Sequence, residues 1–266
     1  MADIDENIAE ASQGALAKAY EDLLSPAVKP IGEIASYIPR AIKIFLAPFE
    51  KWLINREETI RLTKAAITEK LNKIPEEKIV APEAYVAIPA MQQLSYCQDS
   101  KALREMYANL LVSSMNSDKK DDVHPGFIDI IKQLTPDEAK LLNTLSPDTI
   151  FLYPLIDMSF RFTEEKGEHP LIKNFTTQGA DILDNPRNMP SYIDNLARLG
   201  IIDISGKYER LSDEKAYEPL ESSPLLETYK LRNMSGDPAA LTYRYTRRYF
   251  HLTAFGSALI RICCTK

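Results

Sequence analysis

The stretch YANLLVSSMNSDKKDDVHPGFIDIIKQLTPDEAKLL, residues 107–142, joins two apolar helical patterns across a charged turn. The first pattern begins just upstream, in KALREMYANLLVSSMN, where apolar residues recur every three or four positions. This spacing places them on one face of a helix, which ends at the polar sequence SDKKDD. The residues of this face are Leu103, Met106, Tyr107, Leu110, Leu111 and Ser114. We therefore expect the first half of the chain to be predominantly helical.

The His-Pro-Gly sequence within this stretch raises the question of a reactive or metal-binding site. Asp118, Asp121 and Asp122 lie close to His124 in the sequence. They belong to a polar loop, however, and no second His or Cys stands at the spacing that a metal site needs. Pro125 suits the first turn of a helix, because its missing N–H has no intrahelical partner there. We interpret His-Pro-Gly as a joint between two packed helices.

A second helix start follows at TPDE, residues 135–138. Thr135 suits the N-cap position, Pro136 suits the first helical position, and Glu138 completes a capping box. The buried side of this helix is expected to carry Leu141, Leu142 and Leu145.

From this helix onward the pattern changes to helices alternating with strands. MPSYIDNLARLGIIDI, residues 189–204, predicts a helix that ends at Gly200 and continues directly into a strand. LTYRYTRRYFHLT, residues 241–253, predicts a second strand, and AFGSALIRICC, residues 254–264, predicts a last helix with Thr253 as its N-cap. This order is typical of a winged helix.

We therefore predict a mainly α protein with a small antiparallel sheet near its C-terminus. The expected organisation is a helical domain at residues 1–134 and a winged-helix-like domain at 135–266, with insertions around 160–188 and 206–240. An insertion as long as the second is either functional or partly disordered.

A winged helix raises the alternative of nucleic-acid binding by a transcriptional regulator. The candidate contacts are Asn195, Arg198, Arg244, Arg247 and Arg248, the last three interleaved with tyrosines. Arginines and aromatic rings suit phosphate contact and base stacking. Asp194 and Asp203 flank the same surface, and alternating Arg and Tyr also occurs on a half-exposed strand without a ligand. We therefore favour a winged helix that packs against protein.

The segment at residues 25–54 is the most apolar part of the chain and carries a local excess of basic residues. Charged residues and prolines interrupt it too often for a membrane-spanning helix. Two interpretations remain open, namely a pair of helices packed in the core and an amphipathic segment that lies on a membrane surface.

The composition gives little material for catalysis. Three separated histidines and three cysteines stand among 266 residues, and P-loop, GxGxxG, GxSxG and HExxH motifs are absent. The net charge of −6 argues against indiscriminate binding to nucleic acid. The N-terminal sequence MADIDENIAEASQ lacks the features of a signal peptide. We expect a cytoplasmic protein that is not an enzyme and uses neither a metal nor a cofactor.

KALREMYANLLVSSMN, VHPGFIDIIKQLTPDEAKLL, NLARLGII and LTAFGSALIRICC together resemble the Abi-alpha (abortive infection alpha) family of bacterial proteins. The resemblance implies phage defence by abortive infection, in which an infected cell is shut down, and it brings no catalytic residues. We therefore expect an antiviral protein that acts by binding, with a protein partner or self-association. Peripheral contact with the inner membrane through residues 25–54 is the further option that the sequence leaves open.

Overall fold

The chain divides into two compact units in the computed structural model. The first comprises residues 1–133 and 262–266, and the second comprises residues 134–261. The end of the chain thus belongs to the first unit, whereas the sequence analysis assigned it to the C-terminal domain. The structure describes residues 66–94, 96–97, 99–162, 167–207, 209–232 and 241–264. The apolar segment at 25–54 lies outside these residues.

The described part of the first unit is built from helices. Residues 66–71 are helical, and η2 (Glu76–Lys78), α4 (Ala84–Leu94), α5 (Lys101–Ser114), η3 (Lys120–Asp122) and α6 (Gly126–Lys132) follow. Ser100 begins α5 as its N-cap, since its hydroxyl accepts a hydrogen bond from the backbone N–H of Leu103 at 3.3 Å. The predicted buried face of α5 is confirmed at Met106, Tyr107, Leu110, Leu111 and Ser114.

The last residues of the chain complete the first unit by binding to α5. The Asn109 Nδ2 donates to the carbonyl oxygen of Cys263 at 2.9 Å, and the Ser113 hydroxyl donates to that of Ile262 at 3.3 Å. These carbonyls belong to the end of the last helix, where backbone acceptors have no intrahelical partner. Side chains of α5 therefore take the place of a C-terminal cap.

The second unit combines helices with one sheet. Its elements are α7 (Pro136–Leu142), β1 (Tyr153–Phe162), β2 (His169–Phe175), η4 (Ala180–Ile182), η5 (Pro186–Asn188), α8 (Met189–Arg198), β3 (Ile202–Ile204), η6 (Glu214–Tyr217), α9 (Glu218–Glu221), α10 (Pro224–Arg232), β4 (Leu241–Leu252) and α11 (Ala254–Cys263). The predicted capping box of α7 is confirmed. The Glu138 N–H donates to the Thr135 hydroxyl, and the Thr135 N–H donates to the Glu138 carboxylate.

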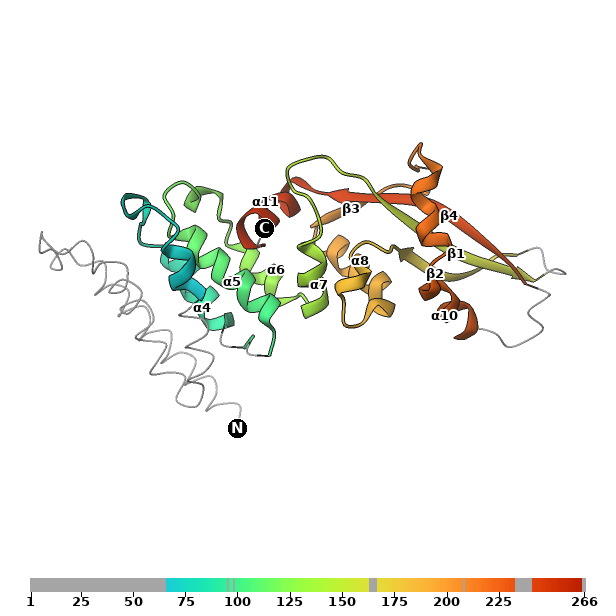
Figure 1. The fold of residues 1–266 in the computed structure, drawn as a ribbon, viewed down its shortest axis with the longest axis horizontal. Helices are drawn as coiled ribbons and strands as arrows, with labels where there is room; N and C mark the ends of the chain where they lie inside the picture. The colour runs from blue at the N-terminus through green and yellow to red at the C-terminus, as the bar shows by residue number, and fades with distance from the viewer. Residues whose placement is uncertain are drawn as a thin grey trace, which may run out of the picture. The chain divides into compact units, whose positions relative to one another are not determined.

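The sheet has four strands in the order β2-β1-β4-β3, and every neighbouring pair is antiparallel. β1 and β4 pair along the whole of β1, from Tyr153 opposite Phe250 to Phe162 opposite Leu241. Figure 1 shows these two strands running side by side as a long ribbon. β3 is short and pairs with the end of β4 beside α11.

The prediction of a mainly α protein with a winged-helix C-terminus is wrong. The order α8, β3, β4, α11 was predicted correctly, but β4 pairs on its other side with β1, and β2 adds a fourth strand. The sequence analysis placed β2 inside the insertion around 160–188. The apolar residues of β2, HPLIKNF, do not alternate regularly along the strand. Two register shifts in the pairing of β1 with β2 explain this irregularity, since a bulge changes which residues face the core.

The region predicted as a long wing insertion, at 206–240, covers one face of the sheet. Its described part forms η6, α9 and α10. Tyr217, Leu220 and Leu226 of these helices are buried in one cluster with side chains of β1 and β2. The cluster residues from the sheet are Ile156, Met158, Ile172 and Phe175.

Candidate functional site

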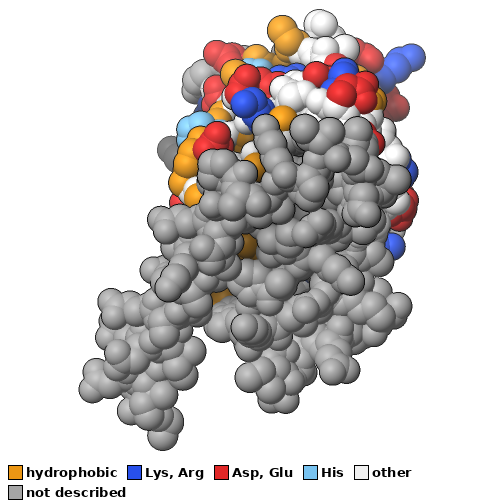
Figure 2. Space-filling model, turned by 90° about the vertical axis from the view of Figure 1, so that its left-hand side faces the viewer, with side chains coloured by type: hydrophobic (Ala, Val, Ile, Leu, Met, Phe, Trp, Pro, Cys, Tyr) orange, Lys and Arg blue, Asp and Glu red, His pale blue; other side chains and the backbone are white. Residues whose placement is uncertain are grey.

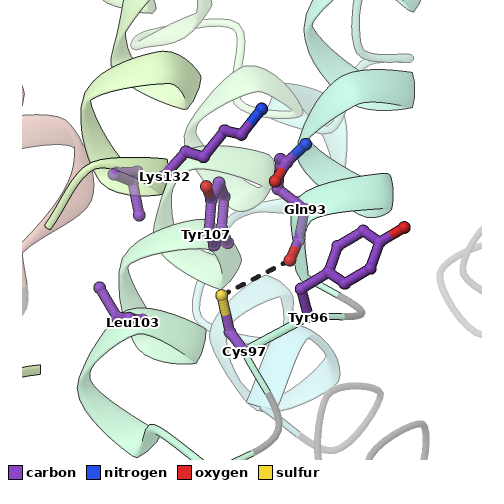
Figure 3. Close-up of a pocket in the computed structure, with 7 residues that line it drawn as sticks. Gln93, Tyr96, Cys97, Leu103, Tyr107 and Lys132 are labelled. Atoms are coloured by element: carbon purple, nitrogen blue, oxygen red, sulfur yellow. Dashed lines mark hydrogen bonds between the residues drawn. The ribbon is translucent and has the colours of Figure 1, made fainter. Parts of the chain in front are cut away.

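A pocket lies among α4, α5 and α6 of the first unit, with a volume of about 490 Å³ (Figure 3). We call it the aromatic pocket, after its two tyrosines. Its lining residues are Gln93, Tyr96, Cys97, Leu103, Tyr107, Ile131 and Lys132. Tyr107 and Ile131 belong to the buried core, whereas the side chain of Tyr96 is largely exposed. The pocket thus combines apolar and aromatic walls with the polar groups of Gln93 and Lys132, and its rim is open.

Two groups in the aromatic pocket could be considered as nucleophiles. The Cys97 thiol donates to the Gln93 carbonyl oxygen at 3.5 Å, and the Tyr107 hydroxyl donates to the Ile128 carbonyl oxygen at 3.3 Å. Burial raises the pKa of the Cys97 thiol, with the charge of Arg104 opposing it, and burial also raises the pKa of Tyr107. Both groups are protonated near neutral pH, which makes them poor nucleophiles.

An exposed apolar loop lies in the second unit, between α7 and β1. Ile150, Phe151 and Leu152 are consecutive, with exposed fractions of 91%, 53% and 37%. They belong to the apolar run TIFLYPLIDMSF, residues 149–160, whose side chains become buried only from Tyr153 onward. We call these three residues the apolar loop. Consecutive exposed apolar side chains are uncommon on a soluble protein unless they bind something.

The base of the apolar loop is held in place by hydrogen bonds. The backbone N–H of Ser146 donates to the hydroxyl of Tyr153 at 2.8 Å, and the Arg261 guanidinium donates to the carbonyl oxygen of Pro147 at 3.1 Å. The ring of Phe151 also packs on that of Tyr153, with centroids 4.7 Å apart. These contacts reduce the entropy that the loop would lose on binding.

The arginines predicted as nucleic-acid contacts lie on two faces of the sheet. Arg247 lies on the face that α9 covers, where its guanidinium donates to both carboxylate oxygens of Glu221 at 2.7 and 3.0 Å. Glu214 adds a second carboxylate at 3.4 Å, and the guanidinium lies over the ring of Tyr217. Such a bidentate pair, shielded by an aromatic ring, is typical of a structural arginine.

Arg248 points to the opposite face, as expected for the next residue of a strand. It donates to the Ser205 carbonyl oxygen at 2.7 and 3.0 Å, to Asp157 at 3.2 Å and to the Asn174 amide oxygen at 3.3 Å. Asn174 adopts a left-handed backbone with φ of 57° and donates through its side chain to Asp194 at 2.6 Å. Arg248 thus joins β1, β2 and the segment after β3 in one polar network.

The remaining predicted contacts also bind within the chain. Arg244 pairs with Glu168 at 2.9 Å, and both side chains are about half exposed. Arg198 donates to the amide oxygen of Asn195 at 2.7 and 3.1 Å. Asn195 in turn donates to Glu138 at 2.8 Å, so its side chain is not presented as a base contact. The structure therefore brings Asn195 and Arg198 together but separates the three arginines of β4.

His124 lies at the start of α6, where its Nδ1 accepts a hydrogen bond from the Gly126 N–H at 3.0 Å. This contact satisfies a backbone donor of the first turn, as the interpretation of His-Pro-Gly as a joint requires. In the described ranges of the chain, no three metal-ligating side chains gather at one place.

Sequence reasoning missed the role of Asp137, a buried carboxylate in α7. It accepts hydrogen bonds from the backbone N–H groups of Asp184 and Asn185 at 2.9 and 2.8 Å, and from the Tyr192 hydroxyl at 3.0 Å. Lys140 pairs with it at 3.3 Å. Burial raises the pKa of Asp137, but the hydrogen bonds outweigh burial and the pKa is lowered. The capping motif TPDE drew attention to Glu138 and gave no signal for its neighbour.

Comparison with protein families shows the family to which this chain belongs. Residues 55–263 match the family model described as abortive infection alpha, and this range covers most of the chain. The chain belongs to the abortive infection alpha family. The resemblance seen in the sequence is therefore confirmed, and with it the association with phage defence by abortive infection.

The range shared with the abortive infection alpha family contains both the aromatic pocket and the apolar loop, whereas the segment at 25–54 precedes it. Comparison with curated proteins and with solved structures gives no match. Within the residues that the structure describes, the helices are too short or too polar to cross a bilayer.

Proposed function

We propose that this abortive infection alpha protein acts in phage defence by binding a protein partner through the apolar loop, without chemistry of its own. The exposure of Ile150, Phe151 and Leu152 on a loop with a fixed base carries this proposal. Full burial of an exposed apolar side chain contributes about 1.5–3 kcal/mol, and Phe151 and Leu152, which are already partly buried, contribute less than Ile150. Three neighbouring side chains can therefore supply the centre of a specific interface.

The charge of the loop favours a protein over an anionic membrane. Between the end of α7 and β1, residues 143–152, the chain carries a single charged side chain, the acidic Asp148, which pairs with Arg261 at 3.8 Å, so the loop presents no excess of basic charge. Anionic lipids attract basic residues and repel acidic ones. Contact of residues 25–54 with a membrane remains a separate prediction, independent of this loop.

The environment of the ionisable groups supports binding rather than catalysis. The half-buried Cys97 thiol and the buried Tyr107 hydroxyl are hydrogen-bonded, and burial raises the pKa of both, so they stay protonated. The arginines of β4 are paired with acidic or carbonyl groups of the same chain. The coloured part of the face in Figure 2 mixes acidic and basic side chains, unlike the single-sign surface that favours nucleic acid.

Infection of cultures that express three forms of the protein tests this proposal. At a low ratio of phage to cells, the wild type and Arg244→Ala, which breaks an exposed pair outside both the loop and the pocket, should protect the culture. Ile150→Ser/Phe151→Ser/Leu152→Ser should not protect it, although it accumulates to the same level. At a high ratio, protected cultures should collapse, as abortive infection requires. Protection by the triple variant, or loss of protection in Arg244→Ala at equal protein level, would contradict the proposal.

A further inference from the structure

We propose that the partner of the apolar loop is a second copy of this chain, and that the loop binds in the aromatic pocket of that copy. This inference rests on the proposed function and identifies the partner that the apolar loop binds. It connects the exposed apolar loop of the second unit of one copy with the open pocket in the first unit of another.

The sizes of the two surfaces agree. Phe151 and Ile150 project from the loop, with exposed fractions of 53% and 91%. The pocket has a volume of about 490 Å³. An apolar cavity of about 150 Å³ is enough to hold a benzene ring. The pocket therefore has room for the phenyl ring of Phe151 together with part of its neighbour.

The chemistry of the two surfaces also agrees. Leu103, Ile131 and the ring of Tyr107 provide apolar and aromatic walls for Phe151. Figure 3 shows Leu103 and Lys132 at different ends of the pocket, so one end is apolar and the other carries an ammonium group. Lys132 is the charged residue of the lining. Asp148, two residues before the apolar loop, has a carboxylate that lies 3.8 Å from the Arg261 guanidinium and is 64% exposed. The opposite signs of Lys132 and Asp148 favour this pairing.

The two surfaces differ, so the contact is heterologous, with the loop of one copy in the pocket of the next. Each chain carries one loop and one pocket. A chain that lacks a working loop can still receive a partner, and a chain that lacks a working pocket can still donate its loop. This ability of two different single variants to associate with each other distinguishes the proposed heterologous contact from a two-fold symmetric dimer.

Sedimentation velocity of purified full-length protein tests the proposal. The average mass of the sedimenting wild-type species should increase as the protein concentration rises from low to high micromolar. Phe151→Ser removes the loop anchor, and Leu103→Glu places a charge in the pocket. Each variant alone should have a dissociation constant raised about 30-fold or more, as expected for the loss of a central apolar anchor. An equimolar mixture of the two should form a heterodimer, because one loop and one pocket remain intact.

Melting curves check that both variants are folded, and Tyr96→Ser at the exposed rim replaces Leu103→Glu if the latter does not fold. A wild type that stays monomeric overturns the proposal, and so does a mixture of two folded variants that stays monomeric. If self-association is absent but Phe151→Ser still abolishes phage protection, the binding function stands and only the second copy is excluded. If Phe151→Ser protects fully, the proposed function fails as well.

Discussion

A Cβ atom added to Gly256 would lie 2.0 Å from the carbonyl oxygen of Ile201, so the first turn of α11 lies directly against the backbone that leads into β3. Thr253 fixes the same junction, since its hydroxyl donates to the Gly200 carbonyl oxygen at 2.7 Å and accepts from the Gly256 N–H at 2.9 Å. Gly200 itself has a φ of 70°. These contacts explain why LGII and LTAFG occur together in this sequence.

We expect Gly256→Ala to be the most damaging glycine substitution in the second unit. The methyl group meets backbone rather than a side chain that can move aside, so the free energy of unfolding should fall by about 3 kcal/mol. The methyl group of Gly200→Ala meets open space. This substitution should lower the free energy of unfolding by about 1–2 kcal/mol, because a residue with a Cβ atom is strained in the left-handed backbone conformation. Gly167→Ala, with open space and no positive φ, is the control and should leave the urea midpoint unchanged. Equal midpoints for all three variants would contradict the close contact.

Arg248 and Arg244 should differ strongly in their contribution to stability. The side chains of Arg248 and Asp157 are 18% and 22% exposed, so Arg248→Ala leaves a carboxylate and a carbonyl without their partner. We expect a loss of about 3 kcal/mol in the free energy of unfolding. Arg244→Ala breaks an exposed pair and should cost less than about 0.5 kcal/mol. Urea denaturation measures both, and a similar small loss in the two variants would show that the network is not structural.

Asp137 should make the second unit sensitive to acid. Burial raises its pKa, but hydrogen bonds from Asp184, Asn185 and Tyr192 outweigh burial and hold the folded-state pKa below the ordinary value of 3.8. A depressed folded pKa contributes stability that is present above the unfolded pKa and lost as pH falls through the folded pKa.

The stability difference between the wild type and Asp137→Asn should therefore be constant above about pH 5 and shrink below pH 3.8. Urea midpoints at a series of pH values measure it. Asp184→Asn is the control, because the Asp184 carboxylate is 72% exposed and pairs with Lys140 at 2.8 Å, whereas it is the backbone N–H of Asp184 that donates to Asp137. A difference that persists unchanged in acid would mean that Asp137 is not ionised in the folded protein.

Local signals in the sequence predicted the helix starts, because capping needs only neighbouring residues. The roles of Thr135 and Glu138 are of this kind. The position of β2 depends on bulges opposite β1, and the cover provided by α9 and α10 depends on contacts between segments far apart in the chain. Such contacts leave no periodic pattern in one sequence. The short helix–strand–strand–helix order was therefore mistaken for a complete winged helix.

The candidate functional surfaces were also predictable only where neighbouring residues determine them. The run TIFL was visible in the sequence, but its exposure follows from the hydrogen bonds of Ser146 and Arg261 at the loop base. The arginines of β4 looked available for a ligand because their partners, Glu221 and Glu168, are distant in the sequence. The aromatic pocket combines residues of three helices, and no single helix predicts it.

The plating efficiency of phage on cells expressing Phe151→Leu and Phe151→Ser tests the central claim most directly, because the two substitutions differ in whether the side chain stays apolar. Phe151 is more than half exposed, so neither change should disturb the core. At equal protein levels, binding through the apolar loop predicts that Phe151→Leu retains most of the protection and Phe151→Ser loses it. Equal protection by the two variants would contradict the account.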